Sequence, residues 1–101
     1  MNLGSTIKTL RKQKGIKQNL FADKCDITQT YLSQIENNAK RPNLSTLQII
    51  SDKLGVPMPI LFFLSLDGED IKPEKRKSYT LLAPSIKSMV NEFFTNTYSK
   101  Q

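Results

Sequence analysis

The stretch that decides the fold is TQTYLSQIEN, residues 28–37. An α-helix advances about 100° per residue, so Tyr31, Leu32 and Ile35 share one arc of such a helix with Thr28. The opposite arc is polar and uncharged, and it holds Gln29, Thr30, Ser33, Gln34 and Asn37. Thr28 is also a good N-cap. The pattern predicts a short helix with one face in a core and one face of amide and hydroxyl groups.

That polar face lacks the Lys and Glu that usually cover a solvated helix surface. Gln and Asn side chains can bond the N6 and N7 atoms of adenine, and the Thr methyl can pack on the thymine methyl. The face therefore favours contact with nucleic acid. The alternative is a neutral polar surface without a ligand.

The residues on either side predict further short helices and no strand. Asn43 is a natural N-cap and Gly55 a natural helix end, and Gly15 ends the first helix. Proline is tolerated at the first position of a helix. The predicted helices are 3–14, 18–25, 28–37, 44–54 and one that begins at Pro57 or Pro59.

The composition disfavours an enzyme. The chain has 101 residues, 38% of them hydrophobic, which suits one small domain with a short appendage. It has no histidine, which excludes Ser–His and Cys–His nucleophile pairs and His-based metal sites. Its one cysteine, Cys25, has no disulfide partner within the chain and is expected to serve packing. We therefore expect no catalytic site, no metal and no cofactor.

The apolar segments are too short to span a bilayer, and the charged N-terminal residues do not resemble a signal peptide. With the single cysteine, this predicts a cytoplasmic protein without a membrane partner.

Charge is unevenly distributed along the chain. Residues 1–45 carry eight Lys or Arg against three Asp or Glu, a net +5. Residues 46–70 carry one against four, a net −3, and residues 71–101 carry six against two, a net +4. A basic N-terminal half favours a polyanion as partner, although solubilising surface charge is the alternative.

The segment covering about residues 3–64 resembles the Cro/CI-like, or XRE-type, helix-turn-helix domain of bacterial and phage repressors. The motifs that carry the resemblance occur in register: Leu10-Arg11, Lys14-Gly15, Gln18, Phe21-Ala22, Tyr31 to Glu36, Arg41-Pro42 and Leu54-Gly55-Val56. The resemblance implies an all-α, five-helix, lambda-repressor-like DNA-binding domain over residues 1–66. It also implies that helix 28–37 is the recognition helix of the major groove.

Three positions depart from the family pattern. Asp26 and Asn38 stand where the family has glycine in a left-handed conformation, and they are the residue types that best tolerate it. Lys17 stands where the family has a Ser or Thr cap for the second helix, and Lys cannot accept the capping bond. The stability lost with this capping bond is understandable if Lys17 contacts a phosphate, and neutral evolutionary drift is the alternative.

The resemblance also implies roles for individual residues. The base contacts expected are Gln29, Thr30 and Gln34, with Ser33 as a weaker candidate. The phosphate contacts expected are Lys17, Gln18, Tyr31, Asn37, Lys40 and Arg41. A largely buried salt bridge between Arg11 and Glu36 is expected to join the first and third helices.

The remaining residues divide into a polar linker, 67–83, and a C-terminal helix, 84–101. Pro73 can start a short helix through Leu82, and Pro84 with Ser85 is expected to open the final one. Its apolar stripe consists of Ile86, Met89, Val90, Phe93 and Phe94. The stripe can pack on its own domain or on a second copy, and the second outcome is favoured as a dimerisation surface.

The resulting hypothesis is a sequence-specific regulator of transcription that binds double-stranded DNA, a repressor acting as a homodimer on a two-fold operator. Two alternatives stay open. One is an antitoxin, with a protein partner, or a restriction-modification controller using the same domain. The other is a protein-interaction adaptor without specific DNA binding, which would have no reason to keep the recognition face uncharged.

Overall fold

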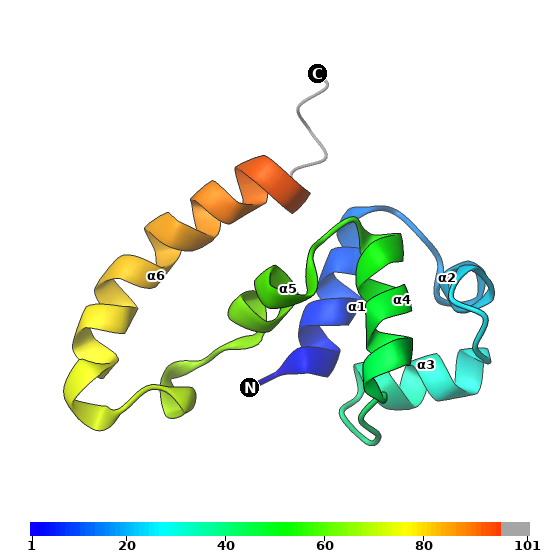
Figure 1. The fold of residues 1–101 in the computed structure, drawn as a ribbon, viewed down its shortest axis with the longest axis horizontal. Coiled ribbons are helices and arrows are strands. Elements are labelled where there is room, and N and C mark those ends of the chain that lie inside the picture. The colour runs from blue at the N-terminus through cyan, green and yellow to red at the C-terminus, as the bar shows by residue number, and fades with distance from the viewer. Residues whose placement is uncertain (96–101) are drawn as a thin grey trace.

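The computed structural model describes residues 1–95, which contain helices and no strand, as the sequence predicts. Figure 1 shows the shorter helices gathered in a cluster and a longer helix that lies apart from most of them. The helices are α1 (Leu3–Gln13), α2 (Gln18–Lys24), α3 (Gln29–Glu36), α4 (Leu44–Leu54), α5 (Met58–Ser65) and α6 (Arg76–Val90). Two 3₁₀ turns, η1 (Gly68–Asp70) and η2 (Pro73–Lys75), connect α5 to α6, and a π-helical turn, η3 (Asn91–Thr95), follows α6. Residues 96–101 of the predicted C-terminal segment lie outside the described residues.

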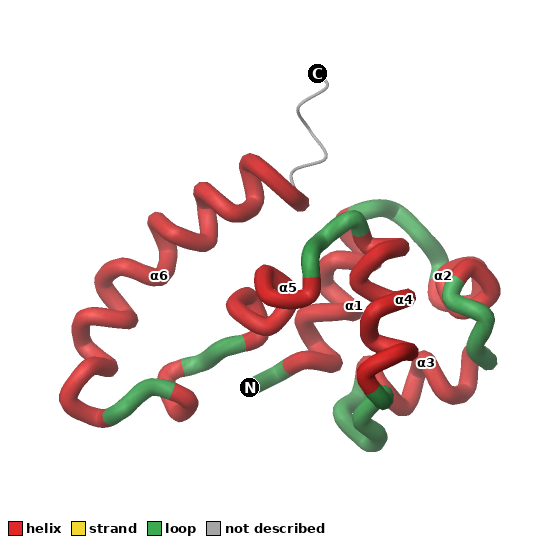
Figure 2. The backbone as a smooth tube through the Cα atoms, viewed as in Figure 1, coloured by secondary structure: helices red, strands yellow, loops and turns green. Residues whose placement is uncertain are grey.

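The five N-terminal helices share one hydrophobic core, and short loops join them (Figure 2). Its fully buried large side chains are Ile7, Phe21, Leu32, Ile35, Ile50, Leu54 and Leu61. Phe21 and Ala22 of α2 are both buried there. The core therefore fixes α3 by its apolar face and leaves the polar face outside.

The helix ends follow the local signals in the sequence. The Thr28 hydroxyl accepts a hydrogen bond from the Tyr31 N–H at 3.0 Å, and the Asn43 side chain accepts one from the Thr46 N–H at 2.9 Å. Gly55 ends α4 with φ 73°. Lys17 precedes α2 without a side-chain capping bond, as predicted.

The start of the last helix is not where the sequence places it. The prediction of a helix opening at Pro84 is wrong, because α6 begins at Arg76 and continues through that proline. Proline inside a helix removes one backbone hydrogen bond. Packing before the proline compensates: Ala83 is buried, and the Tyr79 hydroxyl donates to the Leu66 carbonyl at 3.1 Å.

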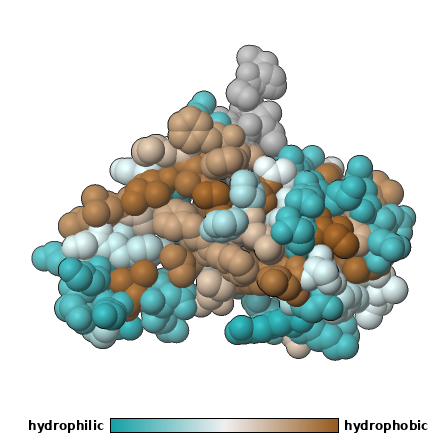
Figure 3. Space-filling model, in the orientation of Figure 1, coloured by the Kyte–Doolittle hydropathy of each residue, from teal (hydrophilic) through white to brown (hydrophobic). Residues whose placement is uncertain are grey.

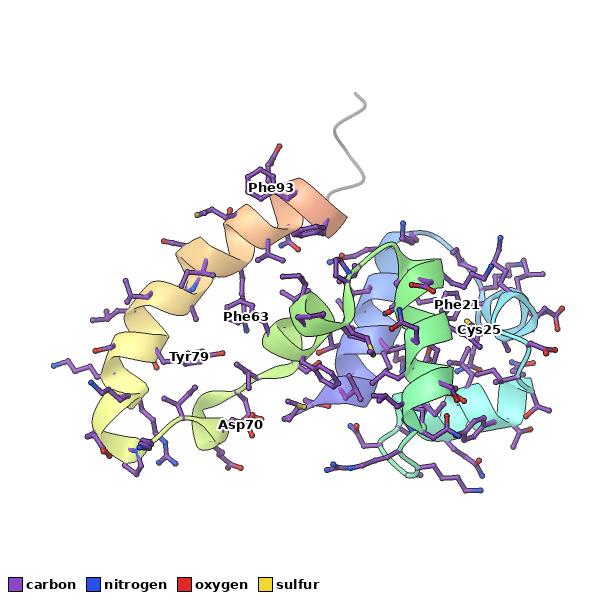
Figure 4. All side chains as sticks on the ribbon, viewed as in Figure 1. Phe21, Cys25, Phe63, Asp70, Tyr79 and Phe93 are labelled. Atoms are coloured by element: carbon purple, nitrogen blue, oxygen red, sulfur yellow. The ribbon has the colours of Figure 1, made fainter. Side chains whose placement is uncertain are left out.

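The inner face of α6 is directed at α5. In Figure 4, Tyr79 extends from α6 toward α5, and Phe63 extends from α5 toward α6. A cavity of about 260 Å³ between them is lined by Phe63, Ile71, Lys75, Ser78, Tyr79, Leu82, Ala83 and Ile86. Part of the tail thus packs on its own domain, the outcome that the sequence analysis did not favour.

Among the helices described, no single one is both long and apolar enough to cross a membrane. The pair α4 and α5, bent by 92°, has the required length and composition only when both helices are taken together.

Candidate nucleic-acid interface

The α3 helix presents an uncharged polar face to solvent. Leu32 and Ile35 are buried in the core, and the Tyr31 side chain packs half-buried against it. Of the predicted base contacts, Gln29 and Thr30 are exposed at the start of the helix. Ser33 and Gln34, one turn further on, are half-buried. Within Gln29–Glu36 the one charged residue is Glu36, and it is buried.

A chain of hydrogen bonds runs from this face into the protein. Gln29 Nε2 donates to Gln18 Oε1 at 3.2 Å, and Gln18 Nε2 donates to Glu36 Oε1 at 3.0 Å. These bonds tie the first residue of α2 to both ends of α3. The Gln29 amide is therefore oriented by a second amide, which is oriented in turn by a buried carboxylate.

The buried carboxylate is paired with Arg11, as the resemblance implied. Arg11 Nε lies 2.7 Å from Glu36 Oε2, and Nη2 lies 3.0 Å from Oε1, so the pair is bidentate. Arg11 Nη1 also donates to the Ile16 carbonyl at 2.8 Å, which fixes the turn between α1 and α2. One ion pair thereby sets the relative positions of α1, α2 and α3.

The predicted phosphate contacts lie mostly at the two ends of this arrangement. Lys17 is exposed beside the start of α2, while Asn37, Lys40 and Arg41 are exposed in the segment after α3. Tyr31 differs from them because its ring packs against the core. The uncharged face is thus flanked by positive charge on both sides.

Comparison with known proteins accounts for this arrangement. Residues 7–61, which run from α1 into α5, match the Helix-turn-helix family. The chain belongs to the helix-turn-helix family. In helix-turn-helix proteins the second helix of the motif enters the major groove while the first crosses the DNA backbone, so α2 and α3 are the two helices of the motif here.

The relatives of this helix-turn-helix chain include two phage proteins and a control protein. It is 36% identical over 56 residues to the Immunity repressor protein of Bacillus phage phi105, covering 55% of the chain and 39% of that protein. It is 38% identical over 63 residues to the Control protein C.MunI of Mycoplasma sp, covering 61% of the chain and 85% of that protein. It is 37% identical over 59 residues to the ImmF control region 10 kDa protein of Bacillus phage phi105, covering 58% of the chain and 66% of that protein. The alignment therefore spans about two fifths of the immunity repressor.

Both predicted left-handed residues of the helix-turn-helix domain are confirmed, with φ 57° at Asp26 and 60° at Asn38. Asn38 does more than tolerate this conformation. Its Oδ1 accepts a hydrogen bond from the Gly4 N–H at 3.0 Å, and its Nδ2 donates to Asn2 Oδ1 at 2.8 Å. A Cβ on Gly4 would overlap the Ile35 carbonyl oxygen, so α1 and the end of α3 are in direct contact.

Sequence reasoning missed the side-chain roles of Gln18 and Asn38. The sequence predicts only a phosphate contact for Gln18, whereas in the structure its side chain connects Gln29 to Glu36. The one available signal is the position of a glutamine at the first residue of both α2 and α3. No comparable signal marks the contact between Asn38 and α1.

Cys25 lies in the helix-turn-helix core and is confirmed as a packing residue. It is buried at the end of α2, and this burial raises the pKa of its thiol to about 11. At neutral pH the thiol is protonated, which makes it a poor nucleophile and a poor metal ligand. Within residues 1–95, no three His, Cys, Asp or Glu side chains are grouped as metal ligands would be.

Proposed function

We propose that the protein is a regulator of transcription that binds double-stranded DNA in a sequence-specific manner, with α3 in the major groove. The observation that carries the proposal is the uncharged amide and hydroxyl face of α3, held by the Gln29–Gln18–Glu36 hydrogen bonds. A face of this kind can match the donors and acceptors of base edges without competing charge. Residues 1–66 form the DNA-binding domain in this proposal.

The contacts divide by chemistry. Side chains that can reach base edges specify the sequence: Gln29, Thr30, Gln34 and, more weakly, Ser33. Groups around these base-reading side chains bind phosphates and set the register: Lys17, Gln18, Tyr31, Asn37, Lys40 and Arg41. The phosphate contacts supply most of the affinity for any DNA, and the base contacts supply the difference between sequences.

An α3 helix of eight residues spans only a half-site, which supports a homodimer on a two-fold operator. Two relatives bear the names immunity repressor and control protein, and this supports repression as the mode of action. A DNA-binding domain of this family supports action in the cytoplasm. The second candidate function is a restriction-modification controller. It fits the domain equally well, because the aligned region covers 85% of the Control protein C.MunI.

Substituting Gln29 or Gln34 by alanine is expected to weaken binding to the preferred site by about 1–3 kcal/mol each, with little change on random DNA. Each substitution removes a base-edge donor and acceptor and leaves the phosphate contacts in place. The measurement is a fluorescence-anisotropy titration on a site selected from random duplexes. Gln48→Ala, which removes an exposed glutamine of α4, is the matched control. Equal losses on both DNAs would show that α3 does not read bases.

Affinity is expected to fall linearly with the logarithm of salt concentration, and Lys40→Ala or Arg41→Ala should reduce that slope by about one. Each residue neutralises one phosphate and releases about one counterion. Titrations across a salt series measure the slope for each variant. Lys53→Ala, which removes an exposed charge from the last turn of α4, should leave it unchanged. A slope unaffected by the first two substitutions would remove them from the phosphate contacts.

A further inference from the structure

The α6 helix has an apolar face that its own domain does not cover. Tyr79, Ala83 and Val90 lie on the inner side, where Ala83 is buried and the other two are half-buried. Beside this inner side, four exposed large side chains lie on one face: Leu82 (59%), Ile86 (43%) and Met89 (60%) of α6, and Phe93 (72%) of the following turn η3. We name these four residues the outer seam. In Figure 4, Phe93 points away from α5.

The spacing of the outer seam is that of a helix-pairing surface. Its residues follow one another at intervals of four, three and four, the a/d pattern by which two helices interlock side chains. A patch of this kind on a monomer marks a partner surface. Figure 3 shows hydrophobic residues gathered along α6 and the adjoining α5 on this side of the molecule.

We propose that the outer seam pairs with the outer seam of a second copy of this chain. The inference rests on the homodimer of the proposed function and names the surface that forms it. A second copy brings identical groups together, so like charges must not face each other across the paired seams. Within α6 the bordering residues are the uncharged Ser78 and Ser85. Lys75 directly precedes α6 and lines the cavity between α5 and α6, and an antiparallel arrangement of the two seams keeps the two Lys75 side chains at opposite ends of the pair. The charged residues Arg76, Lys77 and Lys87 lie more than about 100° around the helix from the centre of the seam.

The surface available to the second copy extends beyond α6. Leu82 and Ile86 belong to the outer seam and also line the cavity beside Phe63 of α5. A helix seated on the seam therefore also covers the edge of that cavity. This continuity joins the pairing surface directly to the domain that carries α3, so pairing constrains the separation of the two recognition helices.

The structure also divides the stripe predicted from the sequence. Ile86, Met89 and Phe93 belong to the outer seam, whereas Val90 is half-buried on the inner side. Leu82 belongs to the seam although the sequence analysis placed it in the linker. Phe94 is 40% exposed, and its ring packs edge-on against Phe93 with centroids 6.4 Å apart, which supports the most exposed ring of the seam.

The test compares seam and off-seam substitutions in the full chain by sedimentation equilibrium. The wild-type protein should reach twice its 11.5 kDa at high micromolar concentration. Leu82→Glu and Met89→Glu place a charge in the paired surface and should each raise the dimer Kd at least tenfold. Leu81→Glu is the matched control, because Leu81 is 70% exposed but lies about 110° around the helix from the centre of the seam. It should leave the Kd within about twofold.

Several results would overturn the pairing: a wild-type chain that stays at 11.5 kDa, or a Leu81→Glu variant as monomeric as Met89→Glu. The pairing would also be overturned by a monomeric wild type that binds anionic vesicles and loses this binding in Met89→Glu, because the seam would then contact a membrane surface. Far-ultraviolet circular dichroism of each variant confirms that the helices persist.

A DNA titration of the same proteins separates this inference from the proposed function. A monomeric wild type that selects a DNA sequence would refute the seam and leave the function standing. A wild-type dimer that Met89→Glu disrupts, but that shows no preference for any DNA sequence, would support the seam and refute the proposed function.

Discussion

Arg11→Met is expected to lower the free energy of unfolding by about 3–5 kcal/mol. The substitution leaves the Glu36 carboxylate buried without its positive partner, with one amide donor from Gln18 remaining. It also removes the donor to the Ile16 carbonyl. Urea unfolding followed by circular dichroism measures the loss, which should appear as a lower midpoint at an unchanged slope.

The control is the double variant Arg11→Met with Glu36→Leu. Replacing both partners of a buried ion pair by apolar residues of similar size is often neutral or stabilising, because no charge then remains to be desolvated. The double variant should therefore recover most of the lost stability. A double variant less stable than Arg11→Met would mean that the pair itself, and not the orphaned charge, accounts for the loss.

Asn38→Ala is expected to cost about 2–4 kcal/mol of unfolding free energy. Alanine is strained at φ 60°, and its substitution leaves the buried Gly4 N–H without an acceptor. The bond to Asn2, the N-cap of α1, is lost as well. Thermal and urea unfolding both report this change.

Glycine at the two left-handed positions separates strain from hydrogen bonding. Asn38→Gly relieves the strain but still removes the bonds to α1, so it should cost about 1–3 kcal/mol. Asp26→Gly relieves the same strain at a residue whose side chain makes no hydrogen bond within residues 1–95. That variant should be neutral or up to about 1 kcal/mol more stable. If Asn38→Gly and Asp26→Gly changed the free energy of unfolding equally, the hydrogen bonds of Asn38 to α1 would not contribute to stability.

Most of the fold could be predicted because its helix ends are set locally. Thr28 and Asn43 cap the helices that follow them, and Gly55 has the left-handed conformation that ends α4. The conformations of Asp26 and Asn38 were predictable for the same reason, since each belongs to a single turn. The resemblance to a known family supplied the pairing of Arg11 with Glu36, which local pattern alone does not give.

Features that depend on distant residues escaped prediction. A proline at residue 84 is a strong local sign of a helix start, but packing of Tyr79 and Ala83 against the α5 side extends the helix through it. The bonds of Asn38 reach residues 34 and 36 positions away along the chain. The position of Leu82 on an exposed face also follows only from where α6 lies. The roles assigned to the residues of the interface itself remain predictions.

Apart from Gln29, the residues on the solvent face of α3 are not those that hold the helix, and this bears on how the protein diverges. Leu32, Ile35 and Glu36 hold the helix in place. The side chains of Thr30, Ser33 and Gln34 make no hydrogen bond to any other part of residues 1–95. Mutations at these three positions can therefore accumulate at little thermodynamic cost. A duplicated gene can acquire a new target while its product keeps the ancestral scaffold.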